Sequence, residues 1–240
     1  MTARHRTGNG TDRRAHFRLA LIVLAPLLVL VPASAWATTH TGAAAKHAAL
    51  RAPAAAGAGA NWSYTWNPPL DLRVHGSTAG FMSLPNNMAS LATQKVVSTA
   101  TFRTNWIDTR ALSDGPNIAQ QGLSVKPPQF KLQIAHGPNP TDHRGDCHID
   151  GATGQTLAYG PRIDVADGKW HTITCIKYPD TAQGTQVVVI VDGVAGTPHW
   201  SHTPIGNINP AGAVRLGGRS AKAATDSLDG WLSFLSFQAT

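Results

Sequence analysis

Short apolar segments separated by turn-forming residues run along the chain from Asn61 onward. These segments are rich in Val, Ile, Thr and aromatic residues, and clusters of Gly, Pro, Asn and Asp lie between them. Such spacing is typical of β-strands. The predicted strands cover residues 95–106, 129–137, 169–178, 185–193, 213–218 and 230–238. Because no stretch after Asn61 keeps a helical period for long, the pattern predicts an all-β sandwich or barrel.

Two Asp-Gly pairs mark tight turns beside predicted strands. Asp192–Gly193 follows one apolar run and precedes another, which favours a hairpin turn with positive φ. Asp167–Gly168 leads into the strand that begins at Lys169. Alternate residues of that strand share a face, with His171, Ile173 and Cys175 on one side and Trp170, Thr172, Thr174 and Ile176 on the other. One of these faces must meet the core.

A hydrophobic run near the N-terminus predicts export. Leu19–Val31 is 13 residues long, follows Arg13, Arg14 and Arg18, and leads into the small-residue segment Pro32–Ala37. This order is that of a Sec-type signal peptide over residues 1–37. An uncleaved anchor is the alternative, but a span needs about 20 apolar residues. Since no second hydrophobic run follows, we expect a secreted chain without membrane insertion after cleavage.

The composition changes twice after the signal peptide. Residues 38–60 are rich in Ala, Gly and Pro and hold almost no large apolar side chains. Such a segment cannot bury enough surface to offset the entropy of ordering, so it is predicted to be a linker. The apolar segments all lie in residues 61–240, which are predicted to form the folded domain.

The positive charge of the chain lies largely in the signal peptide. The whole sequence has 20 basic and 13 acidic residues. Five of the basic residues and one acidic residue precede residue 38, which leaves 15 basic and 12 acidic residues and a net charge of +3. No basic stripe with interleaved aromatic residues remains, so no nucleic-acid partner is expected.

The two cysteines, Cys147 and Cys175, both follow the predicted cleavage site. An even number of cysteines in an oxidising compartment favours a disulfide over a metal site or a redox pair. Two free buried thiols are the alternative.

Four short motifs resemble the laminin G-like domain of the concanavalin A-like lectin/glucanase superfamily, in the arrangement of secreted bacterial examples. They are Asp167-Gly168 with Trp170-His171, then Val191-Asp192-Gly193, then Leu216-Gly217-Gly218, and then Asp229-Gly230 with Phe234 and Phe237. The segments at 117–123 and 130–134 look like the preceding strands of this family. The resemblance covers residues 102–237 well and 61–101 loosely. It implies a jelly-roll sandwich of two antiparallel sheets.

The acidic residues bear on whether the chain is an enzyme. All 13 acidic residues are Asp, so the glutamate-rich strand motif shared by the glucanases of this superfamily is absent. The chain also has no nucleophile elbow, zinc-protease motif or P-loop. We therefore expect a secreted non-catalytic binding module for carbohydrate or cell-surface ligands. The alternatives are a glycan-acting hydrolase on the same fold and a structural envelope protein.

Ligand contacts are expected on the loops, because a sandwich supplies a frame and its connections carry the variable chemistry. Trp106, Trp200 and His199 are the predicted ligand-binding residues, since an indole offers a sugar both an apolar face and an N–H donor. The alternative is that the two tryptophans cover the edge of the core. His171 is interpreted as a framework residue, because a catalytic histidine would need a partner that the sequence cannot place.

The segment 137–150 is a candidate metal site. It contains the acids and histidines Asp142, His143, Asp146, His148 and Asp150. Calcium prefers clustered oxygen ligands, so Ca²⁺ is the metal to consider, although the spacing matches no EF-hand loop. Within the segment, Arg144–Asp146 is predicted to lie in a solvated loop. The sequence does not predict an oligomeric state.

Overall fold

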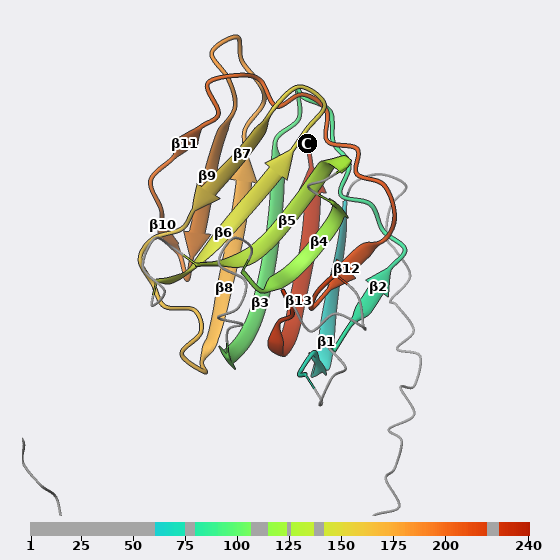
Figure 1. Ribbon diagram of the computed structural model, residues 1–240, viewed down its shortest axis with the longest axis vertical. Coiled ribbons are helices and arrows are strands. Elements are labelled where there is room, and N and C mark those ends of the chain that lie inside the picture. The colour runs from blue at the N-terminus through green and yellow to red at the C-terminus, as the bar shows by residue number, and fades with distance from the viewer. Residues whose placement is uncertain (1–60, 75–79, 107–114, 124–125, 137–141, 220–225) are drawn as a thin grey trace, which may run out of the picture. The chain divides into compact units, whose positions relative to one another are not determined.

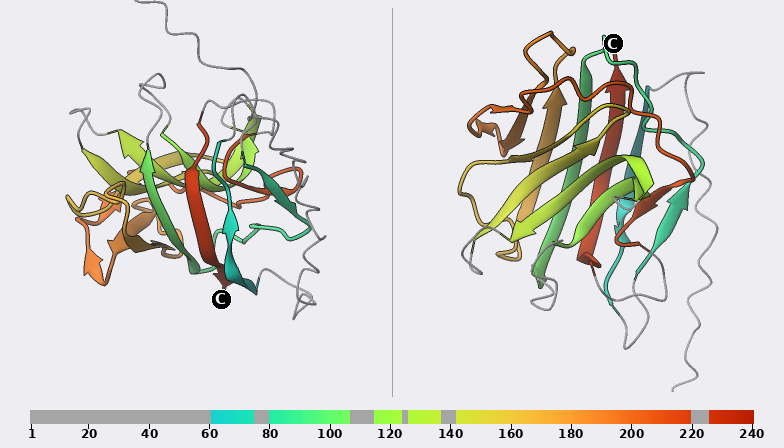
Figure 2. Two further views of the ribbon diagram at one scale, coloured as in Figure 1. Left: turned by 90° about the horizontal axis from the view of Figure 1, so that it is seen from below. Right: turned by 45° about the horizontal axis from the view of Figure 1, so that its top comes forward.

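The computed structural model describes residues 61–74, 80–106, 115–123, 126–136, 142–219 and 226–240. These residues form two antiparallel sheets that lie face to face (Figures 1 and 2). The seven-stranded sheet contains, in spatial order, β1 (Trp62–Asp71), β13 (Asp229–Ala239), β3 (Val96–Trp106), β8 (Trp170–Lys177), β9 (Gln186–Val191) and β10 (Val194–Ala195), with β11 (His199–Trp200) also paired to β9. The six-stranded sheet contains β2 (Met82–Leu84), β12 (Val214–Leu216), β4 (Asn117–Leu123), β5 (Lys126–His136), β6 (His143–Asp150) and β7 (Gln155–Tyr159).

The predicted all-β fold class is confirmed, and each of the six predicted strands is present. Strands distant in sequence are neighbours, as where β13 lies between β1 and β3, so the chain passes repeatedly between the sheets in jelly-roll fashion. The hairpin turn is confirmed too, since Asp192 and Gly193 have φ of 50° and 81° between β9 and β10. None of the described segments is a helix long and apolar enough to cross a membrane. The predicted signal peptide and linker lie outside the described residues.

The core lies between the two sheets and follows the alternation of each strand. On β8 the face that carries His171, Ile173 and Cys175 is the one that points inward. Across the sandwich, the rings of Phe130 and Phe237 meet edge to face with centroids 5.4 Å apart. Burying a side chain of this size stabilises a fold by roughly 1.5–3 kcal/mol.

The disulfide expected from the cysteine count is present and crosses the sandwich. Cys147 of β6 is bonded to Cys175 of β8, with the two α-carbons 6.0 Å apart. Both side chains are fully buried. The two sheets are therefore covalently tied through the middle of the core.

The predicted loop at Arg144–Asp146 is wrong, because these residues belong to β6. Their neighbours Cys147 and Ile149 point into the core, and the pleat sends the intervening residues to the other face. Gly145 points inward, where an added Cβ would lie 2.4 Å from Cδ1 of Ile173. The glycine thus leaves room for a side chain of the opposite sheet rather than forming a loop.

The edge strand β1 was not among the strands predicted from the pattern. It buries Trp62, Tyr64 and Trp66 on one face, and the ring of Trp62 stacks on Phe237 at 6.1 Å. Its register with β13 shifts between Thr65 and Leu70, where the strand contains two prolines. Proline lacks the N–H that a ladder needs, and an edge strand tolerates this.

A buried lysine organises one end of the sandwich. Lys177 ends β8, is fully buried, and places Nζ 3.0 Å from Oδ1 of Asp180. The same ammonium donates a hydrogen bond to the carbonyl oxygen of Ala92 at 3.0 Å. Asp180 also accepts hydrogen bonds from Oγ1 of Thr185 and the backbone N–H of Gly206. Since a buried charge is stable only with such partners, this network ties three connecting segments together.

We expect removal of the disulfide to destabilise the protein. The bond closes a loop with a sequence separation of 28, for which chain entropy gives about 3–4 kcal/mol. The double variant Cys147→Ala/Cys175→Ala should therefore lose about that much free energy of unfolding in urea titrations. Non-reducing mass spectrometry of the parent should show the two cysteines linked. Two alkylatable thiols in the exported parent, or equal stability of parent and variant, would contradict this.

Candidate functional site

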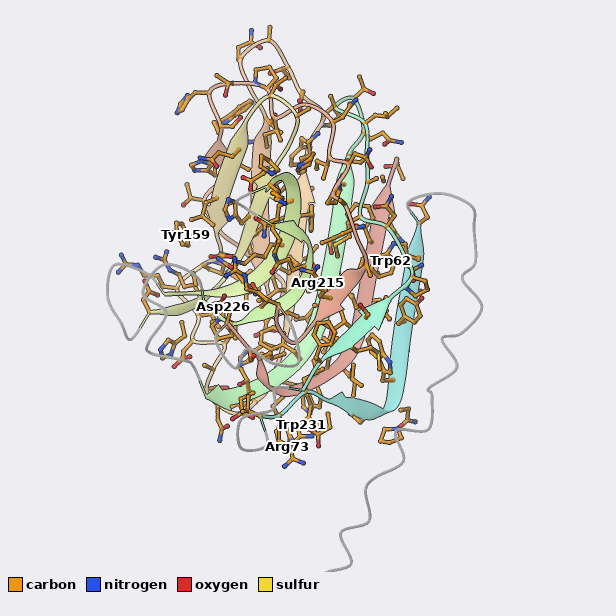
Figure 3. The ribbon with its side chains drawn as sticks, turned by 45° about the vertical axis from the view of Figure 1, so that its right-hand side comes forward. Trp62, Arg73, Tyr159, Arg215, Asp226 and Trp231 are labelled. Atoms are coloured by element: carbon orange, nitrogen blue, oxygen red, sulfur yellow. A yellow bond between two sulfur atoms is a disulfide. The ribbon has the colours of Figure 1, made fainter. Side chains whose placement is uncertain are left out.

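The outward face of the six-stranded sheet carries three rows of polar side chains. The strand register aligns the side chains of each row across neighbouring strands. We call these residues the polar face, and the rows are Arg215, Gln120, Lys131 and His148; Asn117, Gln133, Asp146 and Tyr159; and Gln129, Asp150 and Gln155. Figure 3 labels Arg215 on β12 and Tyr159 on β7, which mark the two sides of this face.

The alternation of β5 and β6 produces the polar face. Phe130, Leu132 and Ile134 of β5 are buried in the core, so the pleat sends Gln129, Lys131 and Gln133 to the outside. On β6, Cys147 and Ile149 point inward in the same way, between the three outward residues Asp146, His148 and Asp150. Taken together, the rows cross five strands, which corresponds to about 19 Å at about 4.8 Å per strand.

Most of the polar face, on β4, β5 and β6, is buried, unlike the outer face of an ordinary solvated sheet. Gln133 is 2% exposed and Asp146 is 1% exposed. On the outer face of the seven-stranded sheet, by contrast, Trp170 is 40% exposed and Thr172 is half-buried. Solvation therefore does not explain the polar composition of this face, because buried polar groups normally require hydrogen-bond partners.

Several buried atoms of the polar face accept no hydrogen bond. Gln120 donates from Nε2 to the carbonyl oxygen of Gly122 at 2.8 Å, and Gln133 donates from Nε2 to Oδ2 of Asp146 at 2.9 Å. These bonds fix the orientation of both amides, and each Oε1 is buried with no donor. Oε1 of Gln129 and Oδ1 of Asn117 are also buried with no donor, and Nδ2 of Asn117 is buried with no acceptor.

Charged and aromatic groups lie among these amides. Nε2 of His148 is 3.1 Å from Oδ1 of Asp150. The guanidinium of Arg144 lies 5.0 Å from the ring centroid of Tyr159. Burial raises the pKa of Tyr159, and the nearby Asp146 raises it further. The phenol therefore stays protonated at neutral pH and can donate a hydrogen bond.

Two pockets border the polar face at the two ends of β6 and β7. One, of 230 Å³, is lined by Pro127, Asp150, Gly151, Gly154 and Gln155. The other, of 250 Å³, is lined by Arg144, Tyr159, Gly160, Thr197, Pro198 and His199. Arg144 and Asp150 are six residues apart on one strand, so the pockets lie about 20 Å apart.

The structure does not bring the predicted ligand-binding residues together. His199 and Trp200 form the short strand β11; both are exposed, Trp200 by 40%, and His199 lines the second pocket. Trp106 ends β3 opposite Asp229, and its side chain lies outside the described part of the chain. The start of β3, not its end, lies at the end of the sheet where Trp200 pairs with Gln186. Ligand binding by these three residues stays a prediction.

The acids and histidines of the candidate calcium segment pair with one another or with nearby side chains. Arg144 pairs with Asp142 at 2.9 Å, and Nδ1 of His143 is 3.4 Å from Asp164. The described residues contain no group of three His, Cys or Asp side chains that could hold a metal ion. Calcium therefore stays a candidate ligand without a site in this part of the chain.

His171 has the carboxylate partners that the sequence could not place, and it has two of them. Its Nδ1 is 2.7 Å from Oδ2 of Asp192, and its Nε2 is 2.9 Å from Oδ1 of Asp167. Asp192 also accepts the backbone N–H of Thr172. The imidazole thus joins the two Asp-Gly turns at one end of the seven-stranded sheet. With both ring nitrogens engaged, this geometry serves the framework and leaves no nitrogen free to act as a base.

The charges of this cluster support one another. Burial lowers the pKa of His171, but hydrogen bonds to Asp167 and Asp192 outweigh burial and raise it above 6.5. Hydrogen bonds from Lys169 and then from His171 lower the pKa of Asp167 far below its usual range. The folded protein therefore favours the imidazolium of His171 and the ionised carboxylate of Asp167.

This cluster predicts a pH dependence of stability. A raised histidine pKa adds stability that is complete below the unfolded pKa of about 6.5 and is lost as the pH rises through the folded pKa. The lowered pKa of Asp167 acts oppositely, so its contribution is lost as the pH falls below 3.8. In urea titrations above pH 6.5, the free energy of unfolding should fall with pH in the parent and less so in His171→Gln. His199→Gln, at an exposed site, should keep the slope of the parent. Equal slopes for the parent and His171→Gln would reject this role.

Comparison with known proteins reveals likenesses of fold at low identity. No protein-family model and no curated protein matches the chain. Among solved structures it is similar to domains LG4-5 of the mouse laminin α1 chain, with 16% identity over 78% of this chain and 44% of that chain, and a TM-score of 0.43. It is also similar to the heptameric SAP-like pentraxin of Limulus polyphemus, with 12% identity over 71% of this chain and 74% of that one, and a TM-score of 0.44. A third similarity is to the endo-1,3-β-glucanase of Streptomyces sioyaensis, with 15% identity over 75% of each chain and a TM-score of 0.40. The two antiparallel sheets form the jelly-roll sandwich that the sequence resemblance implied.

Proposed function

We propose that the chain is a secreted, non-catalytic binding module that takes a carbohydrate ligand on the polar face. The observation that carries this proposal is the set of buried amide groups whose oxygens accept no hydrogen bond. A buried polar atom without a partner is destabilising by about 1–3 kcal/mol. Several such atoms on one face are favourable only when another molecule forms hydrogen bonds with them.

The chemistry of the face suits a sugar. Amide, ammonium and carboxylate groups alternate across four strands, and sugar hydroxyls can both donate to and accept from such groups. Tyr159 borders the rows and is 36% exposed, so its ring can contact the apolar face of a pyranose. The disulfide supports a location in an oxidising compartment, in line with the predicted export.

One observation favours the alternative of a hydrolase on this fold. Asp146, His148 and Asp150 alternate along the outward side of β6, which places two carboxylates on the polar face. Four residues of extended strand separate their α-carbons by about 13 Å. Retaining glycosidases hold their carboxyl groups about 5–5.5 Å apart and inverting ones about 6.5–9.5 Å. The wide spacing of two short side chains, with His148 pairing to one of them, supports binding without hydrolysis.

The test combines binding with stability. The exported protein should be retained on at least one of insoluble β-glucan, galactan or chitin, and it should release no reducing sugar from them. Gln129→Met, which removes a buried oxygen without a donor, should weaken binding about tenfold or more while the free energy of unfolding stays equal or rises by about 1 kcal/mol. Gln238→Met, at an exposed position of β13, should bind like the parent.

Besides a failure to bind any saccharide, two results would overturn the proposal. One is a Gln129→Met variant that binds like the parent but is clearly less stable, since the polar face would then be a structural layer. The other is sustained hydrolysis that disappears in Asp146→Asn or Asp150→Asn, since the chain would then be an enzyme.

A further inference from the structure

The 230 Å³ pocket at the Asp150 end of the polar face has a lining of mixed chemistry. Asp150 supplies a carboxylate that is 5% exposed, and its Oδ1 accepts no conventional hydrogen bond, although Nε2 of His148 is 3.1 Å away. Gln155 of β7 lies beside it on one side and Gln129 of β5 on the other. Pro127 adds an apolar ring to the same pocket.

Backbone hydrogen bonds hold the turn that lines this pocket. The N–H of Gly154 donates to the carbonyl oxygen of Ile205, and the N–H of Gly151 donates to the carbonyl oxygen of Gly154. A Cβ added to Gly151 would lie 2.3 Å from the carbonyl oxygen of Ile205. The connecting segment at Ile205 thus packs against the turn between β6 and β7. The pocket is therefore already formed without a ligand.

The amide atoms of the polar face that make no hydrogen bond are mostly acceptors. Oε1 of Gln120 and of Gln133 are acceptors whose orientation is fixed by the bonds that the same amides donate. Oδ1 of Asp150 is an acceptor by its chemistry. A ligand that completes these groups must donate hydrogen bonds, which hydroxyl groups do and carboxylate, sulfate or phosphate groups do not.

Resting on the proposed function, we infer that the Asp150 pocket is a subsite for one neutral sugar unit, which donates two hydroxyl hydrogens to Asp150 and packs its C–H face on Pro127. The volume of 230 Å³ lies just below the range of about 300–1,000 Å³ for sites of drug-sized ligands, which suits a single ring. The negative charge of Asp150 excludes an acidic unit. A calcium ion would need six to eight oxygen ligands, and one carboxylate beside a histidine does not supply them.

The experiment uses the exported protein and soluble oligosaccharides. Isothermal titration compares neutral β-gluco-, galacto- and chito-oligosaccharides with oligogalacturonate, each with EDTA and with added Ca²⁺. The parent should bind a neutral oligosaccharide equally in both buffers and should not bind oligogalacturonate. Asp150→Asn should weaken that binding about tenfold or more. Gln155→Ala should weaken the binding of the neutral oligosaccharide several-fold. Gln155 is exposed, so this substitution should leave the fold intact.

Asp164→Asn is the matched control, because Asp164 is an exposed carboxylate outside the pocket. It should bind like the parent, and thermal melts should show all three variants folded. Binding that is unchanged in both Asp150→Asn and Gln155→Ala, is lost with EDTA, or favours oligogalacturonate would overturn the subsite while leaving a carbohydrate-binding polar face intact. If no saccharide binds in either assay, the proposed function fails and the subsite fails with it.

Discussion

The six-stranded sheet buries its inner face and, on β4 and β5, the polar residues of its outer face as well, and the candidate site depends on this constraint. Its inner face is apolar and packs against the seven-stranded sheet, with Phe130 meeting Phe237 across the core. Side chains of a strand alternate, so an apolar inner row forces the intervening residues outward. On β5 those residues are Gln129, Lys131 and Gln133, and each is almost fully buried. A sheet with two buried faces is normally apolar on both. The buried polar groups of the outer face therefore indicate that another molecule binds there.

The outer face of the seven-stranded sheet, by contrast, is in contact with water. There the hydroxyls of Thr101 and Thr172 bond to each other at 2.9 Å across neighbouring strands. The guanidinium of Arg103 lies 4.2 Å from the ring of Trp231 and 5.3 Å from that of Trp170. The threonine hydroxyls of this face thus bond within the sheet, and the guanidinium of Arg103 contacts two indole rings. The two outer faces therefore differ in kind, because only the six-stranded sheet leaves fixed, buried acceptors for a molecule that is not part of the described chain.

The sequence predicted the strands whose apolar residues are continuous or bounded by Asp-Gly turns, because these signals are local. It missed β1, where Trp62, Tyr64 and Trp66 alternate regularly but are followed by two prolines. It assigned Arg144–Asp146 to a loop, because the reason for Gly145 in a strand is Ile173 on the other sheet, a contact made only in the fold. The alternation of polar residues at 129–133 and 146–150 was visible. The burial of these residues was not visible in the sequence. It depends on the strand order, which makes neighbours of distant residues such as Gln120 and Arg215.

The disulfide has a second consequence besides stability. Cys147 lies between Asp146 and His148 on β6, so the strand that carries the centre of the polar face is the one that is tied to β8. Because the side chains alternate, the bond points into the core and occupies none of the outward surface. Binding groups on a strand that is fixed from below keep their spacing better than groups on loops, which reduces the entropy lost on binding. The same pleat thus places the covalent tie and the candidate site on opposite sides of one strand.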